Sequence, residues 1–173
     1  MKKPNLYIMC GLPRAGKSTW VKRNKKEKIV ISPDTIRREI FGHQFHQNAN
    51  SLVFAFAENM AILLLKQGVD VIIDATHITS GLRNKWKPIA EQCGAKVTVV
   101  WVYINKDIDR NLDVCLERNK LSPKDEKLPV EALQRMAMSF CPPDSENIFS
   151  DLKWFDIIEY RSIQRRKRNN NKT

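Results

Sequence analysis

One nine-residue stretch constrains the fold of this chain more than any other feature. Residues 11–19 read Gly-Leu-Pro-Arg-Ala-Gly-Lys-Ser-Thr, which satisfies the pattern G-x-x-x-x-G-K-[ST] between an apolar segment and a helix-like segment. Such a loop curls so that its N–H groups and the N-terminus of the next helix point at phosphates. The pattern predicts a nucleotide-binding loop made of Gly11, Leu12, Pro13, Arg14, Ala15, Gly16, Lys17, Ser18 and Thr19.

Two side chains of this loop carry expected chemistry. We expect Lys17 to reach the β- and γ-phosphates of ATP or another NTP, and the Ser18 hydroxyl to bind Mg²⁺. GTPases, ATPases and kinases all use such loops, so the loop alone does not name the reaction.

Strand-like and helix-like segments alternate along the chain. Strands are predicted at residues 5–10, 28–32, 70–74, 96–104 and 154–160, and helices at 18–24, 34–41, 48–67, 80–93, 107–119 and 130–140. This alternation predicts an α/β fold with a five-stranded parallel sheet flanked by helices. The apolar side chains of the longest helix are expected in the core: Leu52, Phe54, Ala55, Phe56, Met60, Leu63 and Leu64.

A carboxylate and an arginine begin the segment after the second predicted strand. Residues 32–37 read Ser-Pro-Asp-Thr-Ile-Arg, which places Asp34 and Arg37 at i and i+3 on one face of a helix. At the carboxyl edge of the sheet, Asp34 could accept a proton from an acceptor hydroxyl, and Arg37 could hold the acceptor's phosphate. The alternative is a helix-terminal aspartate favoured by the helix dipole, beside a solvated arginine.

Two further segments carry candidate residues. Asp74 ends the apolar run V-I-I-D, where a Walker-B-like carboxylate would hold Mg²⁺ or its water; a turn-capping aspartate is the alternative. Arg118, with Lys120 and Lys124, opens a charged loop between two helices. That loop could close over the triphosphate as a lid or could be a solvated connection.

Charge and composition limit the function classes. The net charge is +11, and six cations without an acid lie in residues 161–173, which favours a polyanionic partner. The four cysteines are far apart, so we expect neither a disulfide framework nor a zinc site. No stretch is long and apolar enough for a membrane span, and the first residues do not read as a signal peptide. We therefore expect a cytoplasmic protein without a membrane partner.

Several motifs, taken in order, resemble the kinase domain of the bacteriophage and bacterial 5′-hydroxyl polynucleotide kinases. The resemblance covers about residues 5–140 and rests on these segments: GLPRAGKSTW, ISPDTIR, VIIDATHIT followed by Arg83, the LERN of residues 116–119, and LPVEALQRM from residue 128. It implies an adenylate-kinase-like P-loop fold with a lid loop. It also implies catalytic roles for Lys17, Asp34, Arg37 and Arg118, the last of these as a residue of the lid.

Two positions depart from that family's pattern. The family usually has Asn where this chain has His77, which predicts a difference in hydrogen bonding on the acceptor side. Its lid commonly carries a second arginine where this chain has Ser122. Lys120 or Lys124 could replace that arginine only as a point charge, because an ammonium cannot form a guanidinium's paired donors.

The resemblance implies ATP-dependent transfer of the γ-phosphoryl group to the 5′-OH of DNA or RNA, in nucleic-acid end repair. Alternatives are a small-molecule kinase for a nucleoside, sugar or antibiotic, and a nucleic-acid-binding NTPase. We expect residues 1–160 to form the kinase domain, with its lid at about residues 118–128. Residues 161–173 are expected to form a basic, disordered tail. The sequence contains no D-x-D-G-T motif, so a kinase without a phosphatase domain is expected.

Overall fold

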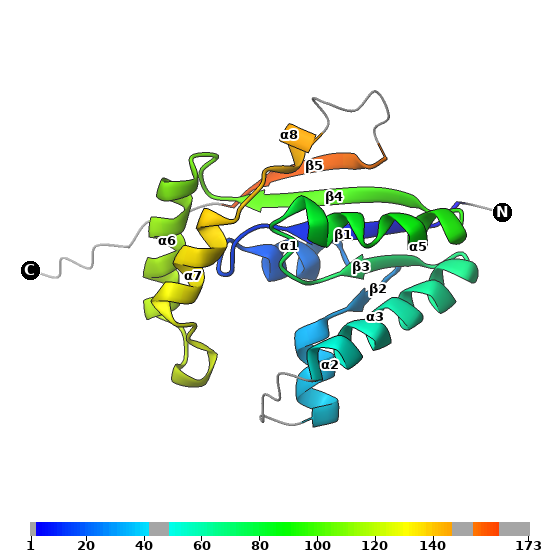
Figure 1. Ribbon diagram of the computed structural model, residues 1–173, viewed down its shortest axis with the longest axis horizontal. Helices are drawn as coiled ribbons and strands as arrows, with labels where there is room; N and C mark the ends of the chain where they lie inside the picture. The colour runs from blue at the N-terminus through cyan, green and yellow to red at the C-terminus, as the bar shows by residue number, and fades with distance from the viewer. Residues whose placement is uncertain (1–2, 42–48, 147–153, 163–173) are drawn as a thin grey trace, which may run out of the picture.

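A parallel sheet forms the centre of the structure, a computed structural model that describes residues 3–41, 49–146 and 154–162. The strand order is β2-β3-β1-β4-β5, and all neighbouring pairs are parallel (Figure 1). The strands are β1 (Asn5–Cys10), β2 (Lys28–Ile31), β3 (Asp70–Ile73), β4 (Lys96–Tyr103) and β5 (Asp156–Arg161). The predicted five-stranded parallel sheet is confirmed.

Helices cover both faces of this sheet. They are α1 (Lys17–Asn24), α2 (Pro33–Phe41), α3 (Ala49–Lys66), α4 (Ser80–Asn84), α5 (Lys87–Gln92), α6 (Ile108–Lys120), the 3₁₀-helix η1 (Lys124–Glu126), α7 (Val130–Met138) and α8 (Pro143–Glu146). One core cluster contains side chains of α3 and α5, and the other contains side chains of α1, α6 and α7. Because successive strand residues point to opposite faces, β1 sends Leu6 and Ile8 into the first core and Met9 into the second.

The strand order places the candidate segments along one edge of the sheet. The nucleotide-binding loop follows the central strand β1, Asp74 follows the neighbouring β3, and α2 follows β2. The chain then crosses to β4 on the other side of β1, so the strand order reverses at the loop, as it does at ligand sites of open α/β sheets. Figure 1 shows α2 beyond the end of β2, α3 alongside β2 and β3, and α6 and α7 beside each other near the carboxyl end of β4.

The prediction of one continuous helix at residues 80–93 is wrong, because two helices occupy this range: α4 ends at Asn84 and α5 begins at Lys87. The start was found correctly: the Thr79 hydroxyl accepts a hydrogen bond from the Leu82 N–H at 3.2 Å. Pro88 lies in the first turn of α5 and has no N–H to continue the hydrogen bonding of α4. The proline therefore starts a new helix.

The prediction that the apolar run of α3 lies in the core is wrong for most of its members. The side chains facing the sheet are Val53, Ala57, Ala61 and Leu65, whereas Leu52, Phe54, Phe56, Met60 and Leu63 are exposed, together with Ala55. Leu64 is half-buried against the core. Because apolar side chains occupy most of the circumference of α3, its composition did not single out the buried face, and alanines allow the helix to approach the sheet closely.

Other differences are small. The lid predicted at about residues 118–128 contains η1, the strand predicted to end at Tyr160 includes Arg161, and α8 was not predicted. Gly42, His43, His46 and residues 163–173 of the predicted tail lie outside the described residues. Within the described ranges, no helix has the length and apolar character needed to cross a bilayer.

Candidate functional site

The loop at residues 11–16 has a backbone that only certain residues can adopt. Gly11 has a φ of 146°, and a Cβ atom there would lie 2.3 Å from the carbonyl oxygen of Val102 in β4. Gly16 has a φ of 112°, and its Cβ would lie 2.7 Å from the Ser162 hydroxyl oxygen. Gly11 is therefore required by its close approach to backbone as well as by φ, and Gly16 is favoured chiefly by φ. Arg14 has a φ of 68°, a left-handed conformation that is unusual for an arginine.

Lys17 is the first residue of α1, immediately after Gly16 of this loop. Its ammonium group donates hydrogen bonds of 2.9 Å to the carbonyl oxygens of Gly11 and Leu12, and the residue is 9% exposed. Burial lowers the pKa of Lys17, while the negative charge of Asp74 favours the charged form. The cation is thus desolvated in advance and aimed into the curl of the loop.

Asp74 immediately follows β3 and is half-buried, with its N–H bonded to the Ile31 carbonyl oxygen at 2.9 Å. Burial raises its pKa, Lys17 opposes that shift, and Asp34 adds to it. Lys17, Asp74 and Asp34, predicted from three separate segments, are therefore close enough to interact electrostatically.

The donors near the loop fit a magnesium ion better than an all-protein metal site. Ser18 is exposed in the first turn of α1, and Asp74 supplies one carboxylate nearby. Within residues 3–41, 49–146 and 154–162, no group of three or more His, Cys, Asp or Glu side chains could hold a metal ion. One hydroxyl and one carboxylate suit Mg²⁺, which keeps waters and binds substrate phosphates.

Asp34 and Arg37 lie on one face of α2, as predicted. Arg37 Nη1 and Asp34 Oδ1 form an ion pair of 2.6 Å, and Arg37 Nη2 donates to Asn50 Oδ1 of α3 at 2.9 Å. The Asp34 side chain is 86% exposed, whereas that of Arg37 is 20% exposed. The arginine is therefore held between two helices, and the carboxylate remains accessible to a hydroxyl group.

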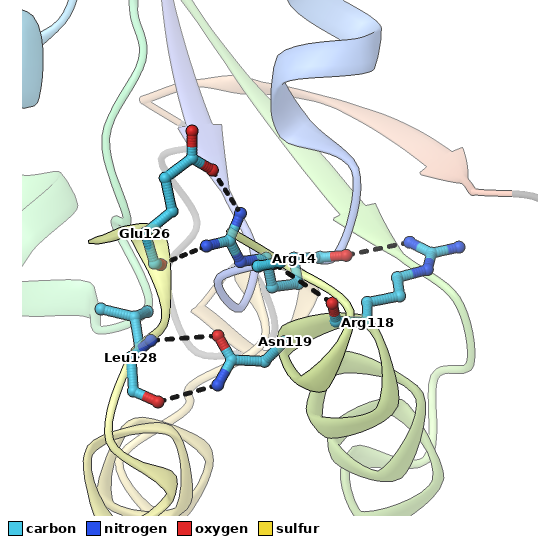
Figure 2. Close-up of polar contacts among 6 residues, drawn as sticks. Arg14, Arg118, Asn119, Glu126 and Leu128 are labelled. Atoms are coloured by element: carbon cyan, nitrogen blue, oxygen red, sulfur yellow. Dashed lines mark hydrogen bonds and ion pairs between the residues drawn. The ribbon is translucent and has the colours of Figure 1, made fainter. Parts of the chain in front are cut away.

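The lid segment is joined to the nucleotide-binding loop from both sides (Figure 2). Arg118 Nη1 donates to the carbonyl oxygen of Arg14 at 2.9 Å and lies 3.5 Å from the Ser162 hydroxyl. The guanidinium of Arg14 forms an ion pair with Glu126 at 3.4 Å and donates to the Glu126 carbonyl oxygen. Arg118, a predicted lid residue, thus lies against the nucleotide-binding loop.

Asn119, near the end of α6, holds the backbone at the far end of the lid segment. Its amide donates to the Leu128 carbonyl oxygen at 2.8 Å and accepts from the Leu128 N–H at 3.1 Å, a paired contact visible in Figure 2. Lys120, considered as a replacement for a second lid arginine, forms an exposed ion pair of 2.7 Å with Glu117. Ser122 donates to the Arg118 carbonyl oxygen at 3.2 Å and so caps the end of α6.

His77 is a core residue rather than a surface group on the acceptor side. It is 3% exposed, its Nδ1 lies 2.9 Å from the Met9 carbonyl oxygen, and its Nε2 accepts from Trp86 Nε1 at 3.0 Å. An indole can only donate and a carbonyl can only accept, so His77 is neutral with its proton on Nδ1. Burial, with the nearby Arg83 and Lys17 charges, lowers its pKa to about 4, although the Met9 carbonyl favours the charged form.

Arg83 ties three segments together beneath the loop. It is fully buried, and its Nη1 donates to the His77 carbonyl oxygen at 2.7 Å and to Cys10 Sγ at 3.4 Å. Its Nη2 donates to the Cys141 carbonyl oxygen at 2.9 Å. This arginine therefore supports the end of β1 from which the loop departs.

Sequence reasoning missed four residues that shape the site: Asn50, Asn119, Glu126 and Ser162. Asn119 is part of the L-E-R-N motif and was available as a signal, because a buried amide beside a charged loop is a typical backbone clamp. The other three gave no local signal, since each acts on a residue at least thirteen positions away.

Comparisons with known proteins show which family and which folded structures the chain resembles. A family model described as an AAA domain matches residues 6–143. Among solved structures, the chain is similar to one in the Pnkp1/Rnl/Hen1 RNA repair complex, at 21% identity and a TM-score of 0.68, over 87% of this chain and 47% of that chain. It therefore spans about half the length of that protein.

Other similar structures differ in their named activities. A putative kinase from Chloroflexus aurantiacus matches at 13% identity and a TM-score of 0.65, over 92% of this chain and 90% of that one. A sugar kinase from Janibacter matches at 14% identity and a TM-score of 0.58, over 92% and 86%. No curated protein matches the chain. These likenesses show the P-loop kinase fold, and because the family model covers most of the residues, the chain belongs to this AAA-domain family.

Proposed function

We propose that this chain transfers the γ-phosphoryl group of ATP to the 5′-OH end of a polynucleotide, in nucleic-acid end repair. The observation that carries the proposal is the pairing of Asp34 and Arg37 on one face of α2. An accessible carboxylate and a held guanidinium stand side by side there, on the same sheet edge as the nucleotide-binding loop. A 5′-terminal nucleotide presents the matching pair, a hydroxyl group and the phosphate on its 3′ side.

The chemistry assigns one role to each member of the pair. Asp34 orients the 5′-OH and accepts its proton as the oxygen attacks the γ-phosphorus. The bond from the γ-phosphorus to the oxygen that bridges it to the β-phosphate breaks, and ADP leaves. Arg37 holds the adjacent phosphate through paired N–H donors, which a free sugar or nucleoside does not engage.

Lys17 and the loop would bind the donor. In the structure the ammonium of Lys17 bonds to the Gly11 and Leu12 carbonyl oxygens, and phosphate oxygens would replace these partners. Mg²⁺ would be held by Ser18 and, through water, by Asp74, and when bound it would neutralise charge on the β- and γ-phosphates. The net charge of +11 supports a polyanionic acceptor.

The proposal is tested by offering γ-labelled ATP with several acceptors: a 5′-OH oligonucleotide, the same oligonucleotide with a 5′-phosphate, a panel of nucleosides and sugars, and water alone. Label on the 5′-OH oligonucleotide but not on its phosphorylated twin is the expected result. Label on a small alcohol would instead favour a small-molecule kinase. Free phosphate as the only labelled product would favour an NTPase.

A matched pair of variants ties that activity to the site. Asp34→Asn removes the expected base, whereas Asp109→Asn changes an exposed aspartate in the first turn of α6. We expect only the first to abolish most of the transfer. Equal activity in both would contradict the role of Asp34.

A further inference from the structure

Arg14 occupies a position in the loop that favours glycine. Its φ of 68° lies in the left-handed region, where a residue with a Cβ is strained by roughly 1 kcal/mol relative to glycine. Removing the side chain would relax that strain, so packing of the backbone does not explain an arginine at this position. The explanation must lie in what the guanidinium contacts.

The guanidinium of Arg14 contacts the lid. It forms a 3.4 Å ion pair with the Glu126 carboxylate and donates to the carbonyl oxygen of the same residue, as Figure 2 shows. The Arg14 side chain is 26% exposed and that of Glu126 is 59% exposed. Exposed ion pairs of this kind contribute little net stability, so a stronger anion can displace the carboxylate.

The backbone of Arg14 is held independently of this contact. Arg118 donates to its carbonyl oxygen from the side of the loop opposite to Glu126 (Figure 2). The loop can therefore keep its shape while the Arg14 side chain changes partner.

In the lid segment, the position where the similar kinases commonly have a second arginine is Ser122 in this chain. The Ser122 hydroxyl caps the end of α6. Lys120 is engaged with Glu117 on the exposed side of that helix. Arg14 places a second guanidinium, beside that of Arg118, between the nucleotide-binding loop and the lid. It therefore stands where it can supply a further cation to the phosphates of the nucleotide.

We propose that Arg14 is a phosphate-binding side chain that exchanges Glu126 for the phosphates of the bound nucleotide. Glu126 competes with the nucleotide for the guanidinium and, once displaced, frees the lid segment to move. This inference rests on the nucleotide-binding half of the proposed function, and it does not depend on the identity of the acceptor.

Three variants test the exchange through the Kd of a non-hydrolysable ATP analogue, measured calorimetrically. Arg14→Gly removes the guanidinium and relieves the backbone strain, so the melting temperature should stay equal or rise. Glu126→Gln removes the competing charge. Glu117→Gln is the matched control, because it neutralises an exposed glutamate in an ion pair of α6. AMP serves as the ligand without β- and γ-phosphates.

The exchange predicts effects of opposite sign. Arg14→Gly should weaken the analogue by about 10- to 100-fold, the range of a charge-assisted contact, with AMP much less affected. Glu126→Gln should tighten binding of the analogue several-fold, and Glu117→Gln should leave it unchanged. A double variant that combines Arg14→Gly with Glu126→Gln should bind the analogue as Arg14→Gly alone does.

A purely structural tether predicts a different pattern. If Arg14→Gly and Glu126→Gln both weakened the analogue, or if neither changed it, Arg14 would not bind phosphate and the inference would be overturned. Failure of the parent chain to bind the analogue would overturn it as well. Binding without transfer to a 5′-OH end would remove the polynucleotide proposal and leave the role of Arg14 intact.

Discussion

The nucleotide side and the acceptor side of the sheet edge are built in different ways. On the nucleotide side, Gly11 packs against β4, Lys17 is desolvated, and Arg118 holds the loop's backbone. On the acceptor side, Asp34 is 86% exposed and is positioned by a single ion pair with Arg37. The nucleotide-binding loop is thus organised before any ligand arrives, whereas the proposed acceptor site is exposed.

This contrast predicts which measurements each side should affect. Substitutions beside the loop should alter nucleotide binding or stability, because the loop shares contacts with the core. Substitutions at the Asp34–Arg37 pair should mainly alter transfer and acceptor choice, because the pair lies on α2, outside the nucleotide-binding loop, and Arg37 is anchored to Asn50 of α3 rather than to that loop.

Asp34→Asn should show the largest effect and the cleanest separation. General-base catalysis contributes about 10²- to 10⁴-fold, so kcat for a 5′-OH oligonucleotide should fall on that scale. The Kd of MgATP, measured by calorimetry, should stay near the parent value. A comparable loss of nucleotide affinity would contradict the separation of the two sides.

Arg118→Ala should have the next largest effect, on the nucleotide side. Loss of a guanidinium that stabilises charge in the transition state is expected to lower kcat by about 10³-fold, with a smaller change in nucleotide binding. Steady-state kinetics and calorimetry check both values. Near-normal kcat in this variant, together with a large loss in Lys120→Ala or Lys124→Ala, would show that another lid residue is the principal cation.

The stability of the supporting core should depend on pH through His77. Its folded pKa is about 4, below the ordinary value of 6.5, so the unfolded state binds more protons between these values. The free energy of unfolding should therefore be highest above pH 6.5 and fall by about 3 kcal/mol as the pH drops to 4. Urea unfolding across that range measures it. His77→Gln should flatten the slope; an unchanged slope would mean that other groups cause it.

The basic tail should have the smallest effect. A truncation after Ser162 keeps Arg161 in β5 and Ser162 against Gly16. Each lost phosphate contact should reduce the salt slope of single-strand binding by about 0.7, and raise KM at low salt without changing kcat. An unchanged salt dependence would exclude the tail from substrate binding.

The comparison also explains which features could be predicted from sequence. The loop, the strands and the Asp34–Arg37 face follow from spacing within a few residues, and the structure has all three. The lid contacts do not, because Glu126 is 112 positions from Arg14 and Arg118 is 104 positions away. No local pattern reports such pairs.

Burial was harder to predict than secondary structure. The α3 helix is apolar around most of its circumference, and the tertiary packing selects Val53, Ala57, Ala61 and Leu65 as its inner face. His77 was treated as a difference in acceptor contacts, yet its two ring nitrogens hold Met9 and Trp86 in the core. In both cases burial depends on strands that lie elsewhere in the sequence: the sheet for α3, and β1, which contains Met9, for His77.

The central claim is that Arg37 selects acceptors by a phosphate next to the hydroxyl, and one measurement tests it most directly. The kcat/KM ratio for a nucleoside 3′-phosphate over the same nucleoside is compared in the parent, in Arg37→Ala and in Arg38→Ala, an exposed neighbour on α2 that pairs with Glu39. The parent and Arg38→Ala should prefer the 3′-phosphate by about 10- to 100-fold, and Arg37→Ala should lose that preference. A parent that uses both acceptors equally well, or an Arg37→Ala variant that keeps the preference, would contradict the account.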